Sequence, residues 1–235
     1  ILSTIWSSTP TKDSAQFFQR GSDAPNIINS VENARQDGEF IGAQVLFAAG
    51  MAPPGQGPND QFLSHALAVE DEVSETILYG LENPEQARKQ VRAASANGIK
   101  FIKIWVDDRG GSQRKLSPPI YEAVIEEAEN LGLKVFVHQQ FASDMPGLLS
   151  AGAHGFLHGR IGQDFDSDIA NQTSVSGAFI IPNWGLAELR REAIGEDSFL
   201  SDIFTNEVMQ PLTAGNDSRQ NALRRDSVSE AERVA

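Results

Sequence analysis

The segment Gly98-Ile-Lys-Phe-Ile-Lys103 joins a glycine, a short apolar run and a terminal lysine. The same pattern recurs at 132–138, which reads GLKVFVH, and at 152–158, which reads GAHGFLH. Glycine favours the position just after a helix because it adopts positive φ without strain. Each segment therefore predicts a helix end, a short strand and a polar residue at the strand tip. In parallel α/β proteins, these carboxyl ends of strands form the rim of the active site.

The three strand tips carry Lys103, His138 and His158, and this combination predicts a metal centre. Imidazole binds Zn, Fe, Ni or Co, whereas a lysine ammonium has no lone pair to donate. Lys103 can be a metal ligand only as a neutral amine, which burial favours, or as the carbamate formed when that amine adds carbon dioxide. A carbamate has two oxygens and can bridge two cations, and a metal pair can make hydroxide near neutral pH. The simpler alternatives are a strand-end lysine that reaches solvent and rim histidines held by hydrogen bonds.

Strands and helices alternate along the rest of the chain, which predicts a parallel sheet with helical crossovers. Further strands are expected at 1–6, 44–49 and 179–182, and helices at 11–20, 26–37, 83–97, 117–132, 143–151 and 166–174. No break in composition is visible, so residues 1–235 are expected to form one domain. Periodicity does not distinguish a barrel from an open sheet. The open-sheet alternative is disfavoured because neither G-x-G-x-x-G nor a Walker sequence is present.

Strand side chains alternate in direction, so the residue two positions before each tip shares its side of the sheet. These residues are all phenylalanine, which predicts an aromatic layer beneath the metals, formed by Phe101, Phe136 and Phe156. The side chains expected to face the helices are Ile102, Val135, Val137 and Leu157. His154 lies at the base of its strand and is expected to be structural.

Several residues near the strand tips are candidates for substrate binding: Trp105, Asp108, Arg109, Gln139, Asn183 and His65. Trp105 shares the direction of Lys103 and would form a wall of the pocket. Asp107, Asp108 and Arg109 follow a strand tip, although Asp and Gly also favour simple turns. His65 lies beyond a Gly/Pro-rich loop at 50–60, which is either functional or a disordered surface loop.

The chain resembles the metal-dependent amidohydrolase superfamily, and within it the imidazolonepropionase-like and Xaa-Pro or Xaa-Arg dipeptidase-like branch. The segments that carry this resemblance are IKFIKIWVDD at 99–108, VFVH at 135–138 and LSAGAHGFLHG at 149–159. The resemblance implies a (βα)₈ barrel in which a carboxylated Lys103 bridges two divalent ions, with zinc expected. His138 and His158 would be the ligands from strands five and six.

The resemblance also implies an enzyme that hydrolyses amide-type C–N bonds with a metal-bridging hydroxide, in a small substrate such as a dipeptide or cyclic amide. The family's His-x-His pair on strand one and aspartate on strand eight have no counterpart here. We therefore expect an incomplete barrel that runs from about strand two to helix seven, without the flanking small β domain. Two alternatives stay open: an inactive barrel fragment, and a metal-free barrel that binds a small ligand with Lys103 as a Schiff-base nucleophile.

Composition limits the partners of the chain. Its net charge of −13 argues against nucleic-acid and anionic-membrane binding, and no apolar run approaches the ~20 residues of a membrane helix. The absence of cysteine excludes disulfides and thiolate zinc sites. We expect a soluble protein that is cytoplasmic, periplasmic or secreted, and a homo-oligomer stays open.

Overall fold

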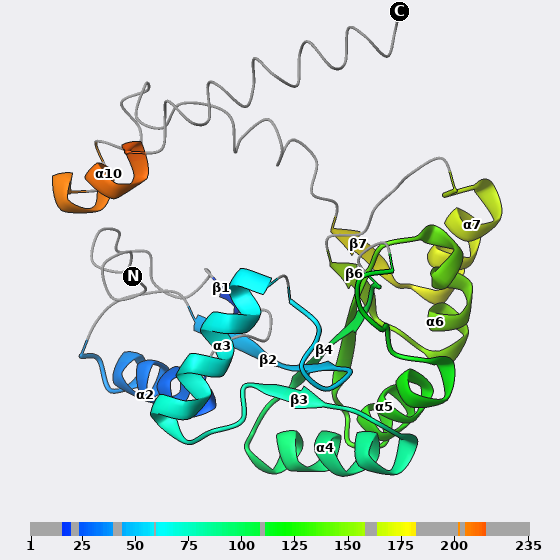
Figure 1. Ribbon diagram of the computed structural model, residues 1–235, viewed down its shortest axis with the longest axis horizontal. Helices are drawn as coiled ribbons and strands as arrows, with labels where there is room; N and C mark the ends of the chain where they lie inside the picture. Colours follow the sequence, from blue (N-terminus) through cyan, green and yellow to red (C-terminus); the bar gives the residue numbers. More distant parts are fainter. Residues whose placement is uncertain are drawn as a thin grey trace, which may run out of the picture. The chain divides into compact units, whose positions relative to one another are not determined.

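A parallel sheet with helices along one of its faces forms the main part of the molecule (Figure 1). The chain divides into two compact units, and the sheet lies in the unit made of residues 15–39 and 43–182. The other unit comprises residues 1–14, 40–42 and 183–235, and its helix α10 spans Asn206–Thr213. The computed structural model describes residues 16–19, 24–39, 44–58, 60–108, 111–157, 164–181, 202 and 205–214.

The described strands all run parallel, in the order β1-β2-β4-β5-β6-β7, with β3 pairing with β2 off this path. Their bounds are β1 Gln16–Gln19, β2 Gln44–Ala52, β3 Leu78–Gly80, β4 Phe101–Val106, β5 Lys134–Gln139, β6 Gly155–Leu157 and β7 Phe179–Ile181. The predicted α/β class and parallel sheet are confirmed. Closure of this sheet into a barrel is not shown by the strands that the structure describes.

The helices follow the strands in the expected alternation. They are α2 Pro25–Gln36, α3 Asp60–Val73, α4 Pro84–Ala96, α5 Pro118–Asn130, the 3₁₀ turn η1 Ala142–Asp144, α6 Met145–Ala151 and α7 Ser167–Ser176. Helix α4 begins as predicted, because the side chain of Asn83 accepts a hydrogen bond from the backbone N–H of Gln86 at 2.9 Å. The three glycines that predict helix ends, Gly98, Gly132 and Gly152, all have positive φ.

Two local predictions need correction. The helix predicted at 11–20 is wrong where the structure describes it, because Gln16–Gln19 forms β1 and pairs with Gln44–Phe47. Two adjacent phenylalanines in this segment favour extended structure, and pairing with a neighbouring strand decides the outcome. The sequence also did not predict α3 and β3. The strand expected at 1–6 lies outside the described residues.

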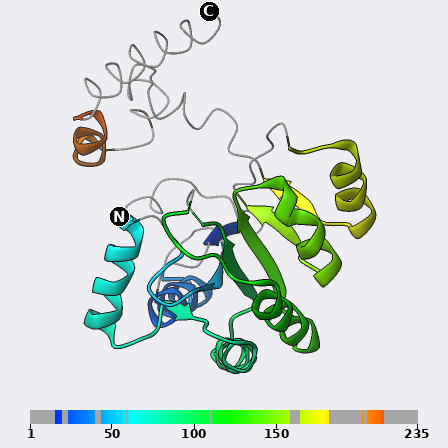
Figure 2. The ribbon, with the colours of Figure 1, turned by 45° about the vertical axis from the view of Figure 1, so that its right-hand side comes forward.

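The main core lies between the sheet and the helices. Its strand residues include Ile102 and Ile104 of β4, and its helix residues include Val91 of α4, Val124 of α5 and Leu148 of α6, each buried completely. We call this side of the sheet the helix face. Figures 1 and 2 show α4, α5, α6 and α7 in a row along it, and each helix contacts the next. Within the described part of the chain, no helix has the length and apolar character needed to cross a lipid bilayer.

Candidate active site

The opposite side of the sheet carries the candidate site, and we call it the Lys103 face. Five side chains define it: Phe101, Lys103, Trp105, Phe136 and His138. In the register of β4 and β5, Lys103 lies opposite Phe136, and Trp105 lies opposite His138. Residues paired across neighbouring strands point to the same side of a sheet. The rings of Phe101 and Phe136 stack with their centroids 5.8 Å apart, as this arrangement requires.

Lys103 is buried in this face, with only 1% of its surface exposed. Its Nζ lies 5.5 Å from the centroid of the Trp105 ring, which is itself buried. Desolvation favours a neutral amine, whereas the face of an indole ring attracts an ammonium. These two effects act in opposite directions on the charge of Lys103. Because the Lys103 side chain is almost completely buried, the simpler alternative of a strand-end lysine that reaches solvent is wrong.

The Gly/Pro-rich loop that follows β2 packs against Trp105. Gly57 has a φ of +120°, and a Cβ at this position would lie 2.8 Å from the Cβ of Ala52 and 3.4 Å from carbons of the Trp105 ring. Only glycine allows so close an approach with this backbone conformation. Within this loop, the side-chain oxygen Oε1 of Gln56 accepts a hydrogen bond from the backbone N–H of Arg114, at 2.9 Å. The described residues of this loop are thus packed against Trp105 and do not form a disordered surface loop.

His138 forms a hydrogen-bonded pair with Asp107, which directly follows β4. The distance from Nε2 of His138 to Oδ2 of Asp107 is 2.9 Å, and the two side chains are 17% and 4% exposed. Asp107 continues the alternation of Phe101, Lys103 and Trp105, so the sequence contained the signal that places it here. The prediction named Asp107 together with Asp108 and Arg109, and it took Asp108 as the candidate for substrate binding. The carbonyl of Asp108 accepts the N–H groups of Gly111 and Gln113 and closes the turn.

The direction predicted for Phe156 is wrong. In the register of β5 and β6, Phe136 lies opposite Gly155, and Val137 lies opposite Phe156. Phe156 therefore packs in the core on the helix face, and Leu157 takes the Lys103 side. The aromatic layer is completed by Phe179, whose ring centroid lies 5.5 Å from that of Phe136.

His158 lies outside the described residues. Its place beside Lys103 was inferred together with that of Phe156, from the alternation of side chains in one strand, and Phe156 lies on the opposite, helix face. His158 therefore stays a prediction that rests on the resemblance and on the order of the three tips.

The structure places one of the remaining predicted site residues on the wrong face of the sheet and leaves the side chains of the others undescribed. Gln139 is buried opposite Val106, on the helix face, because it follows His138 by one position in a strand. Its Oε1 has no hydrogen-bond partner in the part of the chain that the structure describes. The backbone of His65 lies in α3, but its side chain is not described. Arg109 and Asn183 lie outside the described residues.

Two of the three expected metal ligands thus share one face of the sheet. Lys103 is buried there, and His138 lies on the adjacent strand, with its Nε2 engaged by a carboxylate. Among the residues that the structure describes, no group of three or more His, Cys, Asp or Glu side chains could hold a metal ion. The donor atoms present fit part of a metal centre, and the expected third ligand is His158.

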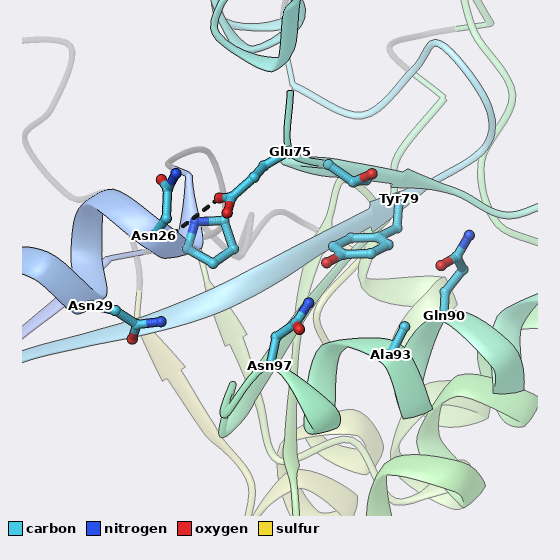
Figure 3. A pocket seen from close by; sticks show the side chains of 9 residues that line it. Asn26, Asn29, Glu75, Tyr79, Gln90, Ala93 and Asn97 are labelled. Atoms are coloured by element: carbon cyan, nitrogen blue, oxygen red, sulfur yellow. Dashed lines mark hydrogen bonds between the residues drawn. The ribbon is translucent and has the colours of Figure 1, made fainter. Parts of the chain in front are cut away.

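A separate polar pocket of about 430 Å³ lies away from these residues (Figure 3). Asn26 and Asn29 of α2 line one side, and Gln90 and Asn97 from α4 and its carboxyl end line another. Tyr79 of β3 forms part of the wall, and burial raises the pKa of its phenol. No predicted site residue lines this pocket.

No family model and no curated protein sequence matches the chain. Its structure is similar to that of a Xaa-Pro dipeptidase with bound methionine in the active site, with a TM-score of 0.57 and 20% identity over 90% of this chain and 51% of that chain. For A. niger ochratoxinase the TM-score is 0.59, with 18% identity over 88% of this chain and 48% of that chain. For phenylurea hydrolase B the TM-score is 0.53, with 17% identity over 87% of this chain and 49% of that chain.

At these identities the similarity concerns the fold. The resemblance to amidohydrolases is therefore confirmed at the level of the fold, and another similar structure is described as an amidohydrolase. The chain spans about half the length of these solved structures.

Proposed function

We propose that the protein is a metal-dependent hydrolase of amide-type C–N bonds in small substrates such as dipeptides or cyclic amides. The observation that carries the proposal is the buried Lys103 on the same face as His138, on neighbouring parallel strands. Solved structures with this fold include a Xaa-Pro dipeptidase and a phenylurea hydrolase. Because the chain spans about half their length, the proposed activity is that of the complete protein, with this sheet as part of a (βα)₈ barrel.

In this proposal, a carboxylated Lys103 bridges two divalent cations, with zinc as the expected ion, and His138 and His158 bind them. When bound, the cations would supply hydroxide near neutral pH and polarise the scissile carbonyl. The chain itself contributes a buried, desolvated amine, which in its neutral form can add carbon dioxide. Trp105, together with the loop at Gly57, shields this amine from bulk water.

The substrate would approach from the carboxyl ends of the strands. Trp105 would form the wall of its pocket, and Asp108, Arg109, Asn183 and His65 remain the proposed contacts at the rim. Gln139 is no longer proposed, because its side chain lies on the helix face.

Metal analysis of a Lys103→Ala variant tests the proposal. We expect about two zinc ions per molecule of the complete wild-type protein after reconstitution with zinc and bicarbonate, and the loss of most of this metal in the variant. Lys134→Ala is the matched control, because Lys134 lies on the adjacent strand opposite Phe101 and is exposed. This control should keep its metal.

Two further measurements identify the chemistry. Acetate should partly restore zinc binding to Lys103→Ala, because a small carboxylate can fill the space and supply two bridging oxygens. Full zinc occupancy of Lys103→Ala without acetate would contradict the bridging role. Borohydride trapping of a carbonyl compound on Lys103 would instead favour a Schiff-base mechanism.

A further inference from the structure

Asp107 is a buried charged residue to which the proposed metal chemistry gives no role, and its burial calls for a reason. Its side chain is 4% exposed, and a carboxylate is rarely buried unless it is paired or hydrogen-bonded. One partner of this carboxylate is Nε2 of His138, at 2.9 Å.

Hydrogen bonds within the chain hold the backbone around Asp107 in place. The carbonyl of Asp107 accepts a hydrogen bond from Nε2 of Gln113 at 3.0 Å. The carbonyl of Asp108 accepts from the backbone N–H groups of Gly111 and Gln113, both at 3.0 Å. The segment that leaves β4 is thus fixed by its own turn, and the hydrogen bond to His138 then sets the position of the carboxylate.

The chemistry of the pair determines which ring nitrogen carries the proton. An ionised carboxylate can only accept a hydrogen bond, so Nε2 of His138 must be the donor. In the neutral imidazole this places the lone pair on Nδ1. A metal-binding histidine commonly donates its other N–H to a carboxylate, which fixes the tautomer and the ring orientation and strengthens the ligand.

We propose that Asp107 is a positioning residue that holds His138 as its Nε2–H tautomer and makes Nδ1 the nitrogen that binds a metal. This inference rests on the proposed function for its metal, but the tautomer of His138 can be measured without one.

Long-range ¹H–¹⁵N spectra of the metal-free protein, labelled with ¹⁵N-histidine and recorded above pH 8, test the tautomer directly. The resonance of His138 is assigned by its loss in His138→Gln. We expect the Nε2–H tautomer in the wild type. In Asp107→Asn we expect a mixture of tautomers, because an amide can either accept a hydrogen bond from Nε2 or donate one to it. Asp71→Asn, an exposed position on α3, is the control and should leave the tautomer unchanged.

Zinc affinity, measured by competition with a chromogenic chelator, provides the second readout. We expect a loss of about 10–100-fold in Asp107→Asn and none in Asp71→Asn. If the wild type does not bind zinc but His138 responds to Asp107 as described, the proposed hydrolase function fails while the positioning of the ring stands. A wild-type His138 with its proton on Nδ1, or the same tautomer in wild type and Asp107→Asn, overturns the inference.

Discussion

At the scale of single residues, the surroundings of His154 favour the neutral form of its imidazole ring. It lies at the base of β6, where its Nδ1 accepts a hydrogen bond from the backbone N–H of Val135 at 3.3 Å. Its own backbone N–H donates to the carbonyl of Val135 at 2.9 Å. Burial lowers the pKa of His154, the nearby Lys134 lowers it further, and Glu129 acts in the opposite direction. The structural role predicted for this residue agrees with these contacts.

The lowered pKa of His154 predicts a pH dependence of stability. The pKa in the folded protein lies below the ordinary value of 6.5, so between these two values the unfolded chain binds more protons. The free energy of unfolding should therefore decrease as the pH falls below about 6.5. Urea unfolding of wild type and His154→Asn between pH 5 and 7.5 measures this, and the variant should show a smaller decrease. Equal slopes for the two proteins would contradict the assignment.

At the scale of elements, helix α6 approaches α5 closely at a glycine. A Cβ at Gly147 would lie 2.7 Å from the hydroxyl oxygen of Tyr121, and the next nearest atom, Cζ of the same ring, would be 3.9 Å away. The conflict thus involves one oxygen atom. The approach of the two helices depends on the small size of one residue and on the position of one hydroxyl group.

This contact predicts opposite effects of one substitution in two backgrounds. Gly147→Ala should lower the free energy of unfolding by about 1–3 kcal/mol in the wild type, because the added methyl meets the Tyr121 oxygen. In a Tyr121→Phe background it should be neutral or stabilising by up to ~1 kcal/mol, because alanine favours helix and the clash is gone. Urea unfolding of the four proteins measures the coupling, with Tyr121→Phe alone as the control. An equal effect in both backgrounds would show that the hydroxyl is not the obstacle.

The elements also show what the sequence could predict. Most boundaries followed from local signals, such as the Asn83 cap and the positive-φ glycine Gly132. The direction of the Phe156 side chain could not be predicted in this way, because it depends on the register of β6 against β5, which no local pattern specifies. The segment Gln16–Gln19 became a strand through its pairing with β2. By contrast, counting in steps of two from Lys103 reaches Asp107, so the sequence could have predicted that this residue lies on the Lys103 face.

At the scale of the whole molecule, stability should decrease from the centre of the sheet to its ends. Strands β4 and β5 have neighbours on both sides, and their residues Ile102, Ile104, Val135 and Val137 are buried completely. Strands β1 and β7 end the path of the described sheet. Local opening costs least where few buried contacts hold a segment.

Native-state hydrogen exchange measures this gradient. Backbone amides of β4 and β5 should exchange most slowly, at rates set by global unfolding, and those of β1 and β7 should exchange faster through local opening. Amide protection across the four strands gives the result residue by residue. Protection of β7 as strong as that of β4 would show that β7 is not an edge in solution, as in a closed barrel.

The glycine at the start of β6 has a consequence for the history of the sequence. Gly155 lies opposite Phe179, and a Cβ at position 155 would lie 3.0 Å from Cζ of that ring and from the backbone carbonyl oxygen of the same residue. The missing side chain leaves the room in which Phe179 reaches Phe136 across the intervening strand. A shorter residue at position 179 would remove the contact with the ring but not the contact with the backbone oxygen. Position 155 is therefore expected to stay glycine even in a lineage that replaces Phe179, so substitutions at the two positions should be accepted in one order only.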